Sequence, residues 1–270
     1  MAARRAPAAA WEAWPSMSNS AFAESRFFLK DTIRQRVDFA RTAQSRREPA
    51  PPLQKPCSPE VVRLNLPEGA EALARLGRMA LGEAIAGRES VRDFSAAALS
   101  LEELAALLWA TQGVREVLNA ATALRTVPSA GARHAFETYL AVDRVTSLRP
   151  GLYRYLPFDG QLAQLTTDAQ IGNRAAAACL GQDFVAGAAV TFFWTVLPAR
   201  MEWRYDLAAH KVLALDAGHV CQNLYLAAEA IQCGVCAMAS YDDEAINNLL
   251  KLDGEKFFVI YLASLGKLAS

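Results

Sequence analysis

The sequence predicts an α+β fold, in which helices and strands are arranged in layers. One observation is that stretches with a helical spacing of apolar residues occur together with β-branched and aromatic stretches of strand character. Another is that the two kinds of stretch do not alternate strictly, as they would in a doubly wound parallel sheet. The chain has 270 residues and is 53% hydrophobic, which is enough to bury one sizeable core or two small ones.

Residues 1–60 are predicted to be a tail, a helical arm and a proline-rich connection ahead of a main domain over residues 61–270. Residues 1–16 have two open interpretations, a dispensable tail or a weak targeting segment. Residues 24–45 carry apolar side chains at roughly helical spacing and predict one amphipathic helix. Residues 45–58, SRREPAPPLQKPCS, predict an extended connection. The arm is too short to bury a core alone, so we expect it to pack on the main domain.

The main domain opens with two predicted helices. Residues 69–86 are rich in alanine and leucine and have a helical pattern. Ser100, followed by Glu103 three positions later, forms a capping-box pattern at the start of LEELAALLWATQGV. Gly113 is the predicted end of this second helix.

Strands are predicted from short apolar runs bounded by turn residues, at 137–142, 151–155, 161–165, 188–197 and 257–266. Asp159 and Gly160 predict a hairpin turn between the second and third of these runs. The fourth run, AAVTFFWTVL within 188–197, is continuously apolar, which predicts a strand covered on both faces.

Two further helices are expected towards the C-terminus. Residues 207–232 have few polar interruptions and predict one long helix, buried against the core or against a second subunit, with Gly234 just past its end. Residues 242–252, DDEAINNLLKL, predict a short amphipathic helix. Cys233 and Cys236 form a single CxxC pair, which we interpret as two buried small side chains, because a zinc site would need a second pair of ligands.

Composition excludes several classes of function. The 28 basic and 28 acidic residues balance, and no basic stripe suggests nucleic-acid binding. No apolar run approaches the length of a membrane span. Five irregularly spaced cysteines are poor material for a disulfide framework and favour a reducing cytoplasm. The three histidines lack metal-ligand spacing, so we expect no metal, and no nucleophile elbow or phosphate-binding glycine motif supports a hydrolase or kinase.

Two short motifs could carry chemistry. Arg88, Ser90 and Arg92 could direct two guanidinium groups and a hydroxyl towards one anion, or they could form a solvated charged turn. The small residues of PSAGA, at 128–132, leave room for backbone N–H groups to approach a flat ligand or an anion, or they could form an ordinary tight turn before a strand. For each motif, the residues alone do not distinguish a binding site from an ordinary turn.

Four stretches, taken in order, resemble the nitroreductase-like flavoproteins and most closely their SagB-type dehydrogenase branch. They are RESVRDFS at 88–95, RTVPSAGARHAFETYLAV at 125–142, WRYDLAAHKVLALDAGHVCQNLYLAAEAI at 203–231, and CAMASYDDEAINNLLKLDGEKFFVIYLASLGK at 236–267. The resemblance covers about residues 85–267. It implies a central, mainly antiparallel sheet flanked by helices, with the long helix at a homodimer interface where FMN binds.

The resemblance also implies roles for individual residues. Arg88, Ser90 and Arg92 would hold the FMN phosphate and the adjacent flavin edge, and Lys267 would complete the phosphate site. The loop residues that would lie along the isoalloxazine are Pro128, Ser129, Ala130 and Gly131. The backbone N–H groups of Ala239 and Ser240 would approach the flavin N5, and a pair formed by Arg204 and Tyr205 would be catalytic. The protein then supplies fixed donors and a positive clamp, while the redox chemistry belongs to the cofactor.

Three functions remain open at this stage. The first is an FMN oxidoreductase acting on a small-molecule or peptide substrate and reduced by NADH or NADPH. The second is azoline-to-azole oxidation of a modified peptide in a peptide-modification complex, for which the branch has a Lys-Tyr pair where this chain has Arg204-Tyr205. Arginine stays protonated and is a poor base, so this difference weighs against the second function. The third is a flavin-binding or interaction protein without turnover.

Overall fold

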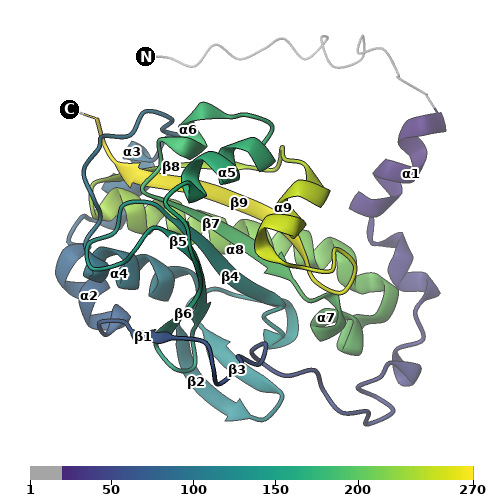
Figure 1. Cartoon of the computed structure of the whole chain (residues 1–270). Helices are drawn as coiled ribbons and strands as arrows, with labels where there is room; N and C mark the ends of the chain where they lie inside the picture. Colours follow the sequence, from purple (N-terminus) through teal and green to yellow (C-terminus); the bar gives the residue numbers. More distant parts are fainter. Residues whose placement is uncertain (1–19, 270) are drawn as a thin grey trace.

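The computed structural model describes residues 20–269, and Figure 1 shows the chain. The α-helices are α1 (Ser20–Leu29), α2 (Gly69–Leu76), α3 (Leu81–Gly87), α4 (Leu101–Gln112), α5 (Ile171–Ala178), α6 (Asp183–Ala186), α7 (Pro198–Tyr205), α8 (Ala209–Ala230) and α9 (Asp243–Leu250). Short 3-10 helices are η2 (Asp31–Arg36), η3 (Phe39–Arg41), η4 (Ala130–Ala132) and η5 (Asp206–Ala208). None of the helices within residues 20–269 is long and apolar enough to cross a membrane.

A seven-stranded sheet forms the centre, with the order β1-β6-β5-β4-β7-β9-β8 and every neighbouring pair antiparallel. Its strands are β1 (Arg63–Asn65), β4 (Phe136–Val142), β5 (Gly151–Leu156), β6 (Gln161–Thr167), β7 (Val190–Val196), β8 (Cys233–Met238) and β9 (Phe258–Lys267). A separate hairpin joins β2 (Val114–Asn119) to β3 (Thr122–Arg125). The predicted α+β fold with a mainly antiparallel central sheet is therefore confirmed.

Helices cover both faces of this sheet. α4 and α8 pack on one face, and α5 and α9 on the other, so that Figure 1 shows α8 behind the sheet and α5 and α9 in front. The alternation of side chains along β7 matches this layering, because Phe192 and Trp194 belong to the first core and Phe193 to the second. All seven residues of β7 are buried, as the continuous apolar run predicts.

Local signals placed several elements correctly. The Ser100 hydroxyl accepts the Glu103 N–H at 3.1 Å and the Glu103 carboxylate accepts the Ser100 N–H at 2.8 Å, which is the predicted capping box of α4. Gly113 ends that helix. The Asp159–Gly160 turn joins β5 to β6, with φ of +62° at Gly160.

Two predicted helices are each interrupted in the structure. Residues 24–45 do not form one helix, because Lys30 is extended and the Asp38 carboxylate accepts the Ala40 N–H at 3.0 Å, a local bond that competes with the helix. Residues 69–86 form two helices, since the first ends at Gly77. The long helix predicted over 207–232 is present as α8, which begins at Ala209 after η5. Asp206, whose φ is +51°, lies between α8 and helix α7, which was not predicted.

The end of α8 also differs from the prediction. Gln232, with φ of +59°, follows the helix, and Cys233 and Cys236 lie in strand β8. Both thiols are buried and free, so the interpretation of the pair as buried small side chains is confirmed. Gly234 has a packing role instead of a capping role, because a Cβ there would lie 2.7 Å from the Val91 side chain. Strands β1 and β8 and the β2–β3 hairpin were not predicted.

Candidate functional site

The segment that contains Arg88, Ser90 and Arg92 runs along the outer strand of the sheet. Ser90 forms a bridge with Val235 of β8, and the Val91 N–H donates to the Val235 carbonyl at 2.9 Å. The absence of a side chain at Gly234 permits this close approach. The segment is therefore held by its backbone, and its polar side chains are left for other contacts.

Tyr225 of α8 organises these side chains. Its hydroxyl lies 3.0 Å from the Ser90 hydroxyl and accepts the Ala237 N–H at 2.8 Å, which ties the segment, the helix and β8 together. The Arg88 guanidinium lies 5.4 Å from the centre of the Tyr225 ring, a cation–π distance. We call Arg88, Ser90, Arg92 and Tyr225 the arginine cluster. Tyr225 was missed because its surroundings in the sequence are a uniformly apolar helix.

The arginine cluster carries uncompensated positive charge. Within residues 20–269, neither Arg88 nor Arg92 forms an ion pair, and the Arg92 guanidinium lies 5.9 Å from the Phe184 ring. Lys267 differs, because its ammonium pairs with Glu103 of α4. Burial is the largest single influence on the Lys267 pKa and lowers it, but the contacts with Glu103 and Cys233 together outweigh burial, so the net pKa is raised. The two arginines are thus available to an anion, whereas Lys267 already has a partner.

The PSAGA loop lies at the other end of α8. We call residues 128–134 loop 128–134. Gly131 has φ of +59°, and a Cβ on it would lie 2.6 Å from Arg204 Nε and 2.8 Å from the Tyr205 hydroxyl oxygen. The structure therefore brings the predicted loop and the predicted Arg204–Tyr205 pair into contact, and this contact needs glycine for both conformation and space.

Asp216 of α8 holds the loop and was also missed by the sequence analysis. Its two carboxylate oxygens lie 3.3 and 3.2 Å from the Ala130 N, and the side chain is 3% exposed. Burial raises the Asp216 pKa, while bonds from Ser129 and Ala130 partly oppose that shift. The Ser129 hydroxyl accepts the His134 N–H at 2.9 Å. Asp216 forms no ion pair with a basic side chain among the residues that the structure describes.

Ala239 and Ser240 follow directly after β8 and are exposed. The Ser240 carbonyl accepts the Gln182 side-chain amide at 3.0 Å. These residues continue the strand whose Ala237 N–H bonds to Tyr225, so they belong on the side of the arginine cluster.

The candidate residues thus form two groups at different heights along α8. Asp216 and Tyr225, which anchor them, are nine residues apart, or about 13 Å at 1.5 Å per residue. The pocket of about 370 Å³ beside Trp109 and Tyr155 is lined by none of the candidate residues.

Comparison with known proteins places this arrangement in a family. The model of the nitroreductase family matches residues 85–267. A protein of Methanocaldococcus jannaschii named putative nitroreductase MJ1384 is 30% identical over 172 residues, which cover 64% of this chain and 84% of that protein.

Solved structures agree on the fold. A nitroreductase structure from Anabaena variabilis has a TM-score of 0.63 at 25% identity and covers 80% of this chain, which in turn spans only 45% of that protein. A chain of the E. coli microcin synthetase McbBCD complex, with truncated pro-MccB17 bound, has a TM-score of 0.57 at 16% identity and covers 94% of this chain and 100% of its own length. Because the family match spans residues 85–267, more than half of the sequence, the chain belongs to the nitroreductase family.

Proposed function

We propose that this chain is an FMN-dependent oxidoreductase that works as a homodimer. In this proposal each flavin lies between the arginine cluster of one subunit and loop 128–134 of the other. The observation that carries it is that the candidate residues form two groups, anchored at different positions along α8. One group contains the arginines, and the other contains the small residues of loop 128–134.

The outer face of α8 supports the dimer. Ala214, Leu215 and Gly218 are exposed on this helix, and Leu215 retains 54% of its accessible surface. Exposed apolar and small side chains on a helix favour a helix–helix contact between subunits. If two copies of α8 cross antiparallel midway between Asp216 and Tyr225, then Asp216 lies level with the partner's Tyr225. A two-fold axis would bring the two groups together twice.

The residues fit the cofactor. Among the described residues, Arg88 and Arg92 offer guanidinium groups without carboxylate partners, as a phosphate requires. Loop 128–134 offers a backbone surface free of large side chains at Ser129–Gly131. Bound FMN would supply hydride and electron transfer. The chain would bind the phosphate, orient the ring and exclude water, and the Tyr205 hydroxyl beside Gly131 is placed to donate a proton at the loop.

NADH or NADPH is the proposed electron donor, and the second substrate is a small molecule or a modified peptide. The alternative is a SagB-type azoline dehydrogenase. It is favoured by the likeness in fold to the microcin synthetase chain over 94% of this sequence. It is disfavoured by Arg204, whose guanidinium lies over the Tyr205 ring at 5.6 Å, because arginine is a poor base where the SagB-type branch has lysine.

A complementation experiment tests the shared site. One subunit carries Arg88→Ala with Arg92→Ala, and the other carries Gly131→Val. Each variant homodimer should fail to retain FMN, because both of its sites are damaged. The mixed dimer should retain one FMN per dimer, since one site then combines two intact halves. If each site lay within one subunit, the mixed dimer would hold none, and a wild-type protein that cannot be reconstituted with FMN would overturn the whole proposal.

The electron donor and the reaction need separate measurements. Anaerobic addition of NADH or NADPH should bleach the flavin absorbance of the reconstituted protein. A flavin that neither nucleotide reduces, but that an azoline-containing peptide does reduce, would favour the dehydrogenase alternative. A flavin that resists all three would favour the binding protein without turnover.

A further inference from the structure

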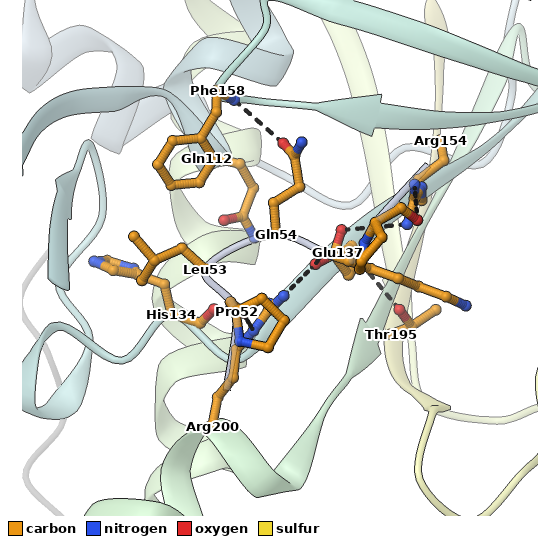
Figure 2. A network of polar contacts seen from close by, with 12 residues as sticks. Pro52, Leu53, Gln54, Gln112, His134, Glu137, Arg154, Phe158, Thr195 and Arg200 are labelled. Atoms are coloured by element: carbon orange, nitrogen blue, oxygen red, sulfur yellow. Dashed lines mark hydrogen bonds and ion pairs between the residues drawn. The ribbon is translucent and has the colours of Figure 1, made fainter. Parts of the chain in front are cut away.

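Residues 52–56 of the proline-rich segment, which we call the strap, are held by buried arginines through their main chain (Figure 2). Three guanidinium groups donate to strap carbonyls: Arg200 to Pro52 at 2.7 Å, Arg125 to Leu53 at 3.1 Å and Arg154 to Pro56 at 3.0 Å. In return the Lys55 N–H donates to the Glu137 carboxylate at 2.6 Å. Because proline has no N–H and a fixed φ, this segment offers carbonyl acceptors on a stiff, extended chain.

The strap carbonyls offset an excess of buried positive charge. Glu137 is the one carboxylate that pairs with these arginines in the part of the chain that the structure describes, at 2.5 Å from Arg200 and 3.9 Å from Arg154. Burial, followed by repulsion from Arg200, lowers the Arg125 pKa to about 10, so Arg125 stays charged at neutral pH. Buried charges need polar partners, and the carbonyl dipoles of the strap supply them here.

Arg200 connects the strap and Glu137 to loop 128–134. It is fully buried on α7 and also donates to the His134 carbonyl at 3.3 Å. In the opposite direction, Arg133 Nε donates to the Arg200 carbonyl at 2.9 Å. One turn further along α7, Arg204 lies against Gly131. A single guanidinium therefore touches the strap, Glu137 and the loop, as Figure 2 shows for Pro52, Glu137 and His134.

Arg154 is in a similar position but does not contact loop 128–134. It is also buried, donates to a strap carbonyl and approaches Glu137. Its hydrogen bonds do not include loop 128–134. The two arginines thus form a natural pair for comparison, because they share burial, strap and carboxylate and differ in the contact to the loop.

We propose that Arg200 is a positioning residue of the candidate site, through which the strap fixes loop 128–134 against α7. The proline-rich segment is then part of the scaffold of the site rather than a passive connection. The role of the loop in flavin binding rests on the proposed function. The effect of Arg200 on the order of the loop does not, and it can be measured without flavin.

The experiment compares amide hydrogen exchange of Arg200→Lys and Arg154→Lys in the full-length protein without added FMN. A lysine keeps the charge beside Glu137, but one ammonium cannot reach all the acceptors of a guanidinium. We expect both variants to lose global stability. Only Arg200→Lys should also speed exchange in residues 129–135 and 200–205, by about tenfold, the equivalent of one lost hydrogen bond. An equal change in both variants, or none in these segments, would overturn the proposal.

A milder variant covers the case in which the buried substitutions prevent folding. The Gln54 side chain anchors the strap without contacting the buried arginines, by accepting the Phe158 N–H at 3.3 Å and donating to Asp159 at 3.1 Å. Gln54→Ala should loosen the strap and, more weakly, speed exchange in residues 129–135. Faster exchange confined to the strap would show that the loop does not depend on it.

FMN titration then distinguishes the two proposals. Arg200→Lys should weaken FMN binding by about tenfold and Arg154→Lys by less than about twofold. A wild-type protein that binds no FMN would defeat the proposed function, and the exchange comparison would still decide the role of Arg200.

Discussion

The arginine cluster and loop 128–134 are held in opposite ways. The cluster is organised by the Tyr225 hydroxyl and ring, and its guanidinium groups have no carboxylate partner among the described residues. The loop is packed from both sides, by buried Asp216 on α8 and by buried Arg200 on α7. In the proposed function, the cluster would therefore gain its charge partner from a ligand, while the loop is already held by hydrogen bonds within the chain. Changes in the first should therefore alter binding, and changes in the second should alter stability as well.

The largest effect is expected from Arg88→Ala combined with Arg92→Ala. Hydrogen bonds to charged groups contribute about 1.5–3 kcal/mol each, so FMN affinity should fall by roughly a hundredfold or more. Stability of the protein without flavin should change little, because neither side chain forms an ion pair within residues 20–269. Fluorescence titration with FMN and thermal unfolding check the two parts, with exposed Arg115→Ala as the control. A large loss of stability without flavin would remove the contrast between the two regions.

Gly131→Ala tests the packing of the loop. Its φ of +59° alone costs a residue with a side chain about 1–2 kcal/mol, and the clash with Arg204 and Tyr205 adds about 1–3 kcal/mol. Gly160→Ala is the matched control, because Gly160 has φ of +62° and no atom within 4 Å of the added Cβ. Urea unfolding should show a loss of about 3 kcal/mol for Gly131→Ala against about 1 kcal/mol for Gly160→Ala. Equal losses would mean that the contact with α7 carries no strain.

The sequence predicted what is determined locally. The capping box at Ser100 and the Asp159–Gly160 turn depend on residues a few positions apart, and the structure has both. The small residues of PSAGA left open a ligand approach or a tight turn. The structure shows Gly131 packed against Arg204 and Tyr205, and the ligand approach stays a prediction.

Long-range contacts account for most of what was missed. Nothing near Tyr225 or Asp216 in the sequence marks them, because their partners lie 135 and 86 positions away in the chain. Strand β8 is short and follows a helix without a glycine stop, so its strand character depends on pairing with β9. The break between α7 and α8 at Asp206 uses a positive φ at a residue that is not glycine, and no sequence pattern predicts it.

Tyr225→Phe should lower the FMN affinity of the arginine cluster by less than the double arginine substitution does. It removes the hydroxyl that joins Ser90 to the Ala237 N–H but keeps the ring beneath Arg88. One neutral hydrogen bond contributes about 1 kcal/mol, so FMN affinity should fall about fivefold. Titration of the variant beside the double arginine variant gives the comparison. A loss as large as that of the double variant would show that Tyr225 does more than orient Ser90 and β8.

Asp216→Asn should have the smallest effect, and its sign depends on pH. Burial raises the pKa of Asp216 in the folded chain above the ordinary value of 3.8, and the groups that face the carboxylate are the Ser129 hydroxyl, the Ala130 N–H and the His219 imidazole. The stability that this group contributes is fully present below pH 3.8 and is lost as pH rises through the raised pKa. Asparagine keeps an acceptor for Ala130 but does not titrate.

The stability of Asp216→Asn relative to the wild type should therefore increase from acid to neutral pH, which thermal unfolding across that range measures. A stability difference between the two proteins that is constant with pH would mean that ionisation of Asp216 does not destabilise the fold. The loop would then be preformed by hydrogen-bond geometry alone, and the contrast with the charge-dependent arginine cluster would be complete.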